Sequence, residues 1–207
     1  MPAEPFGGPW DEDKRLHRTA EESTHGERLR SGPLDGRLLR TAFGKFPTGV
    51  VAVCAMHGQE RVGMAVSAFM PVSLDPPLLS VCIQLSSTTW PRLREAGVVG
   101  VSVLSRAQQA HARRLASKEA DRFAGLEVTR LASGAVVVDG TQAWFECAIR
   151  ESHEAGDHEI VVLEIVQLHV ESHADDPMVF FASGFRGLRH VQGGSADGRA
   201  GLEVAHW

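Results

Sequence analysis

Hydroxylated side chains gather at the ends of two apolar stretches. Of all the patterns in this chain, their spacing is the strongest indication of a ligand-binding site. The stretch from Gly63 ends at Ser67 and Ala68, and the apolar residues 78–85 run directly into SSTTW, residues 86–90. Hydroxyls and unpaired amides ahead of a helix can bind a phosphate. The pattern predicts a site for a flat, phosphorylated ligand. Its candidate phosphate ligands are Ser86, Ser87, Thr88 and Thr89.

Two neighbouring features each admit a second interpretation. Trp90 can pack on a planar ring, or SSTTW is a helix-capping cluster followed by a core tryptophan. In FPTGV, residues 46–50, Pro47 and Gly49 fix a bend at which Thr48 offers a hydroxyl and an amide. The alternative for this motif is a simple turn from helix to strand. Both pairs of interpretations stay open on these residues alone.

Histidines supply the third candidate. His158 stands at the mouth of an expected hairpin, where its ring can reach an open site or simply be solvated. His169, Glu171 and His173 alternate along one strand face, which makes a metal pair conceivable. Spacing adds no carboxylate or cysteine cluster to complete such a site, so we expect no bound metal.

Composition excludes several classes of protein. The chain has 207 residues, 43% of them hydrophobic, and a formal net charge of −5, which fits one folded domain and argues against a nucleic-acid binder. We expect neither a membrane span nor a secretory signal, because no apolar run has the required length. The wide spacing of Cys54, Cys82 and Cys147 predicts buried free thiols in a reducing cytoplasm. Rossmann, Walker A, GxSxG and HExxH motifs are missing from the sequence.

The turn and composition signals divide the chain into three parts. We expect a flexible extension over residues 1–33, one domain over 34–190 and a flexible tail over 191–207. Asp35 can cap the first helix of the domain. The apolar face of that helix would comprise Leu38, Leu39, Ala42, Phe43 and Phe46.

About six to eight strands, mostly linked by hairpins, are expected inside the domain, with two or three short helices. Thr88 or Thr89 can cap a short helix at residues 91–95, and Ser105 can cap a longer one over 106–117. The main strands are expected at 50–56, 61–69, 78–85, 98–104, 142–152 and 158–172. Because long parallel crossovers are scarce, this order favours an antiparallel barrel decorated with helices over a doubly wound sheet.

Taken in order, the motifs resemble one family, the flavin reductase-like proteins with an FMN-binding split barrel. The resemblance is carried by FGKFPTGVVAV, GMAVSAFMPVSLDPPLLSVCI, SSTTWPRLREAG, GVSVLSRAQQAHARRLAS, DRFAG, AWFECAI, GDHEIVVLEIV and VFFASGFRGL, between about residues 35 and 190. Within the family, the chain is most similar to the small reductase components of two-component flavin-dependent monooxygenases.

The resemblance implies a mainly β, antiparallel split barrel that forms a homodimer, with flavin in a groove at the subunit interface. It implies reduction of free FAD or FMN by NADH or NADPH, and release of the reduced flavin to a partner monooxygenase in the cytoplasm. It sets Pro47, Thr48 and Gly49 near the flavin ring, and Ser67, Ala68, Phe69, Val72, Ser73, Leu74 and Asp75 around the ring and ribityl chain. It also implies phosphate binding by Ser86, Ser87 and Thr88, a nicotinamide-facing His158, and Phe185 with Arg186 at the rim.

The chain departs from the family pattern at two positions. Members often have Asn where Ser102 stands and Tyr where Phe185 stands, and this sequence contains neither residue type anywhere. The departures leave the expected fold intact and weaken the assignment of roles at these two residues.

Hydride transfer between nicotinamide and flavin is chemistry of the cofactors, so the protein must supply orientation and electrostatics. Hydroxyls, amides and one histidine suit that task, with His158 positioning the nicotinamide. A phosphate held by neutral hydroxyls instead of an arginine predicts weak, exchangeable flavin binding. Two alternatives remain: a flavoprotein that keeps its flavin for electron transfer, and a small-molecule or haem-binding barrel without redox turnover.

Overall fold

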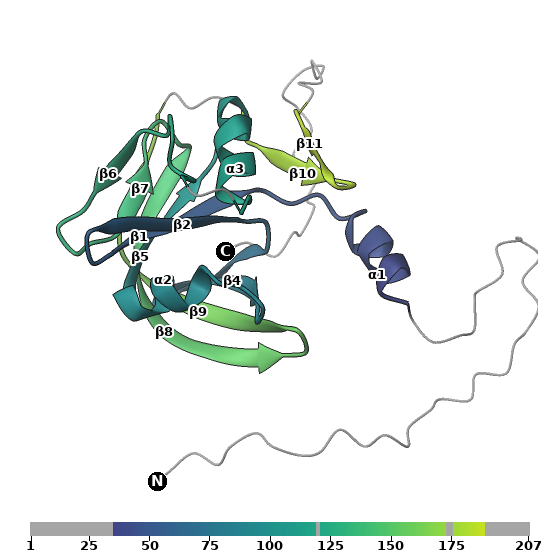
Figure 1. Ribbon diagram of the computed structural model, residues 1–207, viewed down its shortest axis with the longest axis horizontal. Helices are drawn as coiled ribbons and strands as arrows, with labels where there is room; N and C mark the ends of the chain where they lie inside the picture. Colours follow the sequence, from purple (N-terminus) through teal and green to yellow (C-terminus); the bar gives the residue numbers. More distant parts are fainter. Residues whose placement is uncertain (1–34, 119–120, 173–175, 189–207) are drawn as a thin grey trace, which may run out of the picture. The chain divides into compact units, whose positions relative to one another are not determined.

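The computed structural model describes residues 35–118, 121–172 and 176–188, so the expected extension (1–33) and tail (191–207) lie outside the described residues. Its helices are α1 (Gly36–Phe43), α2 (Trp90–Ala96) and α3 (Gln109–Leu115), with a 3-10 turn η1 (Arg106–Gln108) before α3. Its strands are β1 (Val51–His57), β2 (Glu60–Val66), β3 (Phe69–Leu74), β4 (Pro77–Gln84), β5 (Val98–Val103), β6 (Val128–Arg130), β7 (Val136–Val138), β8 (Ala143–Ala155), β9 (His158–Val170), β10 (Val179–Phe181) and β11 (Gly184–Arg186) (Figure 1).

Seven of these strands form one antiparallel sheet in the order β2-β1-β5-β8-β9-β4-β3. The sheet curls until β2 contacts β4, although no ladder joins these two strands. The barrel is therefore split along β2 and β4, and the expected mainly β, antiparallel split barrel is confirmed. Among the described residues, no helix has the length and hydropathy of a membrane-spanning segment.

Strand β1 is buried on both faces, which explains its unbroken apolar sequence. Val51, Val53 and Ala55 pack inside the barrel, whereas Ala52 and Cys54 pack on the outer face. The outer cluster lies between the sheet, α3 and the β6–β7 hairpin (Figure 1). The core thus has two layers, and β1 is shared by both.

The stretch expected as one strand over residues 61–69 is instead divided. Strand β2 ends at Val66 and β3 begins at Phe69. Between them the chain leaves its partner β1 and joins β4, where Cys82 N donates a hydrogen bond of 3.0 Å to Ala68 O. Ser67 and Ala68 form the corner between two ladders, which apolar periodicity along the sequence does not reveal.

The helices also differ from expectation in their ends and packing. The expected apolar face of α1 stays uncovered by the described chain, since Leu38, Phe43 and Phe46 are 48%, 71% and 74% exposed. The helix expected over 106–117 begins as the 3-10 turn η1 and is α-helical only over α3. Ser105 N donates to Gln108 Oε1 at 2.9 Å at its start.

Gly63 allows the segment after α3 to approach β2. A Cβ atom at Gly63 would lie 2.6 Å from Cys54 Sγ and 2.8 Å from Phe123 Cζ, closer than real Cβ contacts. Asp121 Oδ1 accepts a hydrogen bond of 3.0 Å from Phe123 N, which fixes the turn that follows α3. The close approach places Arg122 against β2, where its Nη1 lies 3.3 Å from Gly63 O.

Replacing Gly63 with alanine should lower the free energy of unfolding by about 1–3 kcal/mol, because the added Cβ overpacks this contact. Gly49→Ala is the matched control, since a Cβ atom there meets nothing within 4 Å. Urea unfolding followed by circular dichroism measures both variants. Equal stability of Gly63→Ala and Gly49→Ala would show that the contact at Gly63 is not close-packed.

Candidate functional site

A cavity of about 620 Å³, named here the seam cavity, lies where β2 and β4 lack a ladder. It is lined by residues 64–68, 82–84, 86–89 and 115–118, together with Arg122 and His158. Ligand sites in proteins commonly have volumes of about 300–1,000 Å³. The split in the barrel therefore leaves room for a small organic ligand.

Besides Thr89, a candidate phosphate ligand from the hydroxyl pattern, the seam cavity brings together six of the residues that the family resemblance implies at the site. They are Ser67, Ala68, Ser86, Ser87, Thr88 and His158. These residues come from the corner after β2, the segment between β4 and α2, and the first residue of β9. Residues far apart in the sequence thus line one space.

The expected residues before β1 and in β11 lie elsewhere. Thr48 pairs with β10 through two backbone hydrogen bonds, of 3.0 and 2.8 Å, to Phe180. Phe185 packs edge-on against Phe180 with ring centroids 5.5 Å apart, and Arg113 lies 5.5 Å above the Phe185 ring. Pro47, Gly49 and Arg186 are exposed in this group and do not line the seam cavity.

The expected residues of the β3–β4 hairpin form another separate group. Phe69 stacks on Phe145 with ring centroids 6.3 Å apart and packs against the inner core. Val72 and Leu74 are 38% and 74% exposed. Ser73 is half-buried and Asp75 exposed, and neither lines the seam cavity. The residues of this hairpin that were expected at the site therefore do not line the seam cavity of the same chain.

The segment SSTTW is a helix cap and a core anchor as well as a cavity wall. Thr89 is the N-cap residue of α2, one of the two expected, but its side chain makes no cap bond. Ser87 Oγ accepts a hydrogen bond of 3.1 Å from Trp90 N instead. Trp90 is 2% exposed inside the barrel. The prediction that Trp90 packs on a ligand ring is therefore wrong, and the alternative, a core tryptophan, is correct.

Cationic residues stand beside these hydroxyls, contrary to the expectation of a neutral phosphate site. Arg122 Nη1 donates to Thr89 Oγ1 at 2.7 Å, and both residues line the seam cavity together with Lys118. A guanidinium can bind phosphate through several hydrogen bonds at once. The hydroxyl end of the cavity therefore carries the positive charge that a phosphate ester requires.

His158 is the first residue of β9, and polar contacts of His158 and its neighbour Glu159 hold this part of the strand. Its Nδ1 lies 2.7 Å from Asp157 Oδ1, and this hydrogen bond holds the pKa of the Asp157 carboxyl below its usual value. The adjacent Glu159 is buried and forms an ion pair with Arg94 of α2. Among the described residues, Nε2 of His158 has no hydrogen-bond partner, so this nitrogen is available to a ligand.

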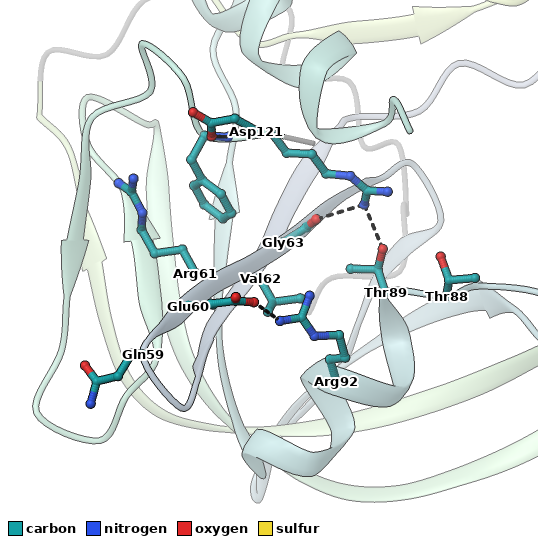
Figure 2. A pocket seen from close by; sticks show the side chains of 11 residues that line it. Gln59, Glu60, Arg61, Val62, Gly63, Thr88, Thr89, Arg92 and Asp121 are labelled. Carbon is teal, nitrogen blue, oxygen red and sulfur yellow. Dashed lines mark hydrogen bonds and ion pairs between the residues drawn. The ribbon is translucent and has the colours of Figure 1, made fainter. Parts of the chain in front are cut away.

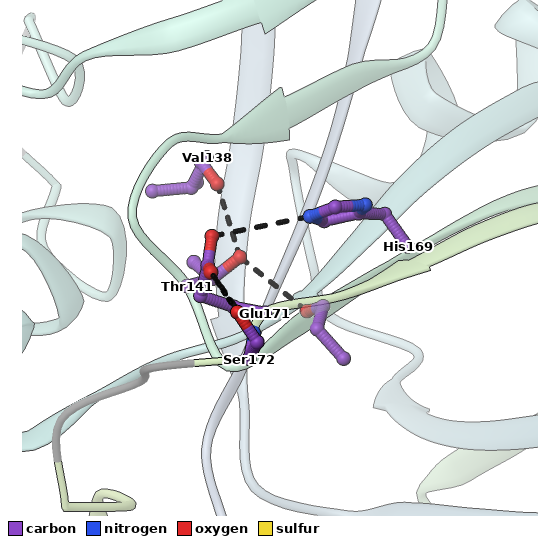
Figure 3. Close-up of polar contacts among 6 residues, drawn as sticks. Val138, Thr141, His169, Glu171 and Ser172 are labelled. Atoms are coloured by element: carbon purple, nitrogen blue, oxygen red, sulfur yellow. Dashed lines mark hydrogen bonds and ion pairs between the residues drawn. The ribbon is translucent and has the colours of Figure 1, made fainter.

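The conceivable metal pair at the end of β9 is organised differently. His169 stacks on Trp144 with ring centroids 5.8 Å apart, and its Nε2 lies 3.9 Å from Glu171 Oε2. Glu171 also accepts a hydrogen bond of 2.9 Å from Ser172 N, in the polar cluster of Figure 3. His173 is outside the described residues. The described residues contain no group of three His, Cys, Asp or Glu that could hold a metal ion.

Comparison with known proteins agrees with this geometry. A model of the flavin reductase like domain matches residues 43–189. The chain belongs to the flavin reductase family. It is 40% identical over 159 residues to a flavin reductase of Pseudomonas putida, and the aligned region covers 76% of this chain and 93% of that protein.

Two further relatives carry more specific descriptions. HsaB of Mycobacterium tuberculosis, the reductase subunit of a flavin-dependent monooxygenase, is 30% identical over 84% of this chain and 94% of its own. The solved structure of the NADH:FAD oxidoreductase SgcE6 of Streptomyces globisporus, in complex with NAD and FAD fragments, superposes with a TM-score of 0.74. It is 34% identical and covers 80% of this chain and 100% of its own.

The structure shows the contacts of Ser102 and Phe185, the two residues that depart from the family's usual pattern. Ser102 is fully buried, and its Oγ accepts a hydrogen bond of 3.0 Å from Val138 N, so it joins β5 to β7. Phe185 belongs to the aromatic contact with Phe180 described above.

Arg122 and Lys118 were not identified as site residues from the sequence. The signal for them was two basic side chains in the loop that follows the helix, in the fragments LASK and DRFAG.

Cys82 offers a direct test of the cavity. It is half-buried and lines the seam cavity, which corrects the expectation of three buried thiols. Burial raises the pKa of Cys54 and of Cys147 to about 12. A thiol-specific reagent at pH 8 should therefore label Cys82 first, and added FAD or FMN should slow that labelling, as measured by peptide mass spectrometry. Labelling of Cys54 before Cys82, or no protection by either flavin, would contradict this site.

Proposed function

We propose that this protein is an NAD(P)H:flavin oxidoreductase that reduces free FAD or FMN and supplies the reduced flavin to a partner monooxygenase. The observation that carries the proposal is the seam cavity, which brings together the hydroxyls of residues 86–89, Arg122 and His158. Membership of the flavin reductase family and the likeness to a monooxygenase reductase subunit support it.

The residues of the seam cavity fit a flavin without any catalytic acid or base. When bound, flavin accepts a hydride equivalent from the nicotinamide cofactor, which is chemistry of the cofactors themselves. Thr88, Arg122 and Lys118 would bind its phosphate. Backbone amides at the Ser67–Ala68 corner can donate to charge on the ring. The apolar walls of β2 and β4 would exclude water from the ring.

We assign His158 to positioning the nicotinamide. Its Nδ1 is engaged by Asp157, which orients the imidazole, while Nε2 is available to an amide or phosphate of the cofactor. Positioning of two reactants accelerates their reaction without any proton transfer by the protein.

A flavoprotein that keeps its flavin is the second candidate. Arg122 favours it, because a charge-assisted contact to phosphate is stronger than the neutral hydroxyl contacts expected from the sequence. The difference between the two candidates is the rate at which flavin leaves, which the dependence of turnover on added flavin measures.

We further propose a homodimer in the cytoplasm. Exposed apolar side chains support the dimer. They are Phe43, Phe46, Met70, Val72, Leu74, Val166, Leu168 and Val170. Several expected site residues of the β3–β4 hairpin stand among them and could complete the groove of a second copy. Free thiols and the use of NAD(P)H support the cytoplasm.

Oxidation of NADH by the purified protein should require added free flavin and rise with its concentration until saturation. The absorbance of NADH at 340 nm measures this with FAD and with FMN. A yellow protein whose activity ignores added flavin would support the flavin-retaining candidate. Absence of NADH and NADPH oxidation with both flavins would exclude the proposed function.

His158→Ala should raise the KM for NADH about tenfold, the loss of one hydrogen bond of roughly 1.5 kcal/mol, with little change in flavin affinity. His153→Ala is the control, because His153 lies in the same hairpin, is exposed and lines no part of the seam cavity. Steady-state kinetics and a flavin fluorescence titration give the two values. Equal losses of NADH and flavin binding would make His158 a structural residue.

A further inference from the structure

A second cavity, of about 590 Å³, lies beside the seam cavity and is named here the arginine cavity. It is formed by residues 59–63 of the β1–β2 turn and β2, by Arg92 of α2 and by residues 121–123 (Figure 2). Thr88, Thr89 and Arg122 line both cavities. The two spaces therefore adjoin at the end of the seam cavity assigned to the flavin phosphate.

Arginines dominate the charge of this cavity. Arg61, Arg92 and Arg122 line it, against the carboxylates of Glu60 and Asp121. Among the described residues, one of these arginines is neutralised by a carboxylate: Arg92 Nη2 lies 2.5 Å from Glu60 Oε2 (Figure 2). The wall carries three positive and two negative charges, which favours an anionic ligand.

The other two arginines are held by neutral groups. Arg122 Nη1 contacts Thr89 Oγ1 at 2.7 Å and Gly63 O at 3.3 Å. The guanidinium of Arg61 lies 5.3 Å from the ring centroid of Phe123. Over the described ranges 35–118, 121–172 and 176–188, neither forms an ion pair with a carboxylate. Both can therefore bind a phosphate without first breaking a salt bridge.

Arg61 also offers a surface for a planar group. The exposed guanidinium of Arg61 lies over the Phe123 ring, and a guanidinium can also stack on a nucleobase. Arg61 is exposed while Phe123 beneath it is buried. The arginine cavity thus combines phosphate-binding cations with a stacking surface, which are the two groups that recognise an adenosine phosphate.

We propose that the arginine cavity binds the adenosine phosphate half of FAD while the flavin half occupies the seam cavity, so that the enzyme prefers FAD to FMN. This inference rests on the proposed function. A flavin with one phosphate would end at Arg122, where the cavities adjoin. FAD continues from that point with a second phosphate and an adenosine. Arg61 can contact them directly, and Arg92 can do so in exchange for its exposed ion pair with Glu60.

The adenosine diphosphate end of NADH has the same chemistry. Its nicotinamide, however, must lie against the flavin ring, whereas FAD carries its adenosine on the flavin phosphate itself. The arginine cavity shares only Thr88, Thr89 and Arg122 with the seam cavity, and these surround the phosphate end. This placement favours the adenosine of FAD over that of NADH.

Flavin fluorescence titrations of the full-length protein test the inference without turnover. The wild type should bind FAD at least about tenfold more tightly than FMN, the difference that one charged phosphate contact supplies. Adenosine 5′-monophosphate should displace FAD and leave FMN bound. Equal affinities for FAD and FMN, or displacement of both flavins alike, would overturn the proposal, and neither measurement needs a variant that might fail to fold.

Variants then locate the effect. Arg61→Ala, and separately Arg92→Gln, should weaken FAD binding about tenfold and change FMN binding less than twofold. Arg130→Ala is the control, an exposed arginine of β6 that lines neither cavity. Equal losses for both flavins would overturn the assignment of these arginines.

Steady-state kinetics distinguishes binding of FAD in the arginine cavity from binding of NADH there. It also distinguishes failure of the cavity assignment from failure of the proposed function. A rise in the KM for NADH alone in Arg61→Ala would assign the cavity to the nicotinamide cofactor and overturn the FAD assignment. Preferential FAD binding without NADH or NADPH oxidation would support the cavity assignment while excluding the reductase function.

Discussion

The missing ladder between β2 and β4 determines where this chain can bind a ligand. Every other neighbouring pair in the main sheet is joined by backbone hydrogen bonds, which leave no space between strands. At the split, Ser67 and Ala68 turn the chain from β1 to β4, and small side chains at this corner leave the seam cavity unfilled. Larger apolar residues at the corner would extend the core into the same space.

The rest of the site depends on how closely other elements approach that split. Gly63 brings Phe123 and Arg122 against the outer side of β2. The ion pair of Arg94 with the buried Glu159 joins α2 to the second residue of β9, next to His158. Trp90, enclosed in the barrel, anchors the start of α2. Core packing thus brings Arg122 and His158 to the split, and their contacts with Thr89 and with Asp157 then orient the two side chains.

The sequence predicted the fold class and the hydroxyl segments that line the seam cavity, because alternation, turns and hydroxyl clusters are local signals. It could not reveal the corner at Ser67–Ala68. An apolar strand has the same sequence pattern whether it pairs with one neighbouring strand throughout or changes from one neighbour to another. It also missed Arg122 as a site residue. An arginine after a helix is ordinary in sequence, and only the close approach allowed by Gly63 sets it among the hydroxyls of residues 86–89.

Arg122 stands where the two cavities adjoin, and this position links two properties that are separate in the sequence. A guanidinium at the junction strengthens the binding of any flavin that carries a phosphate, and so slows its release. The arginines beyond the junction can act only on a ligand that extends past Arg122. Retention of flavin and choice between flavins are therefore governed by different residues. Evolution could change the preference through Arg61 and Arg92 while Arg122 keeps the common phosphate site unchanged.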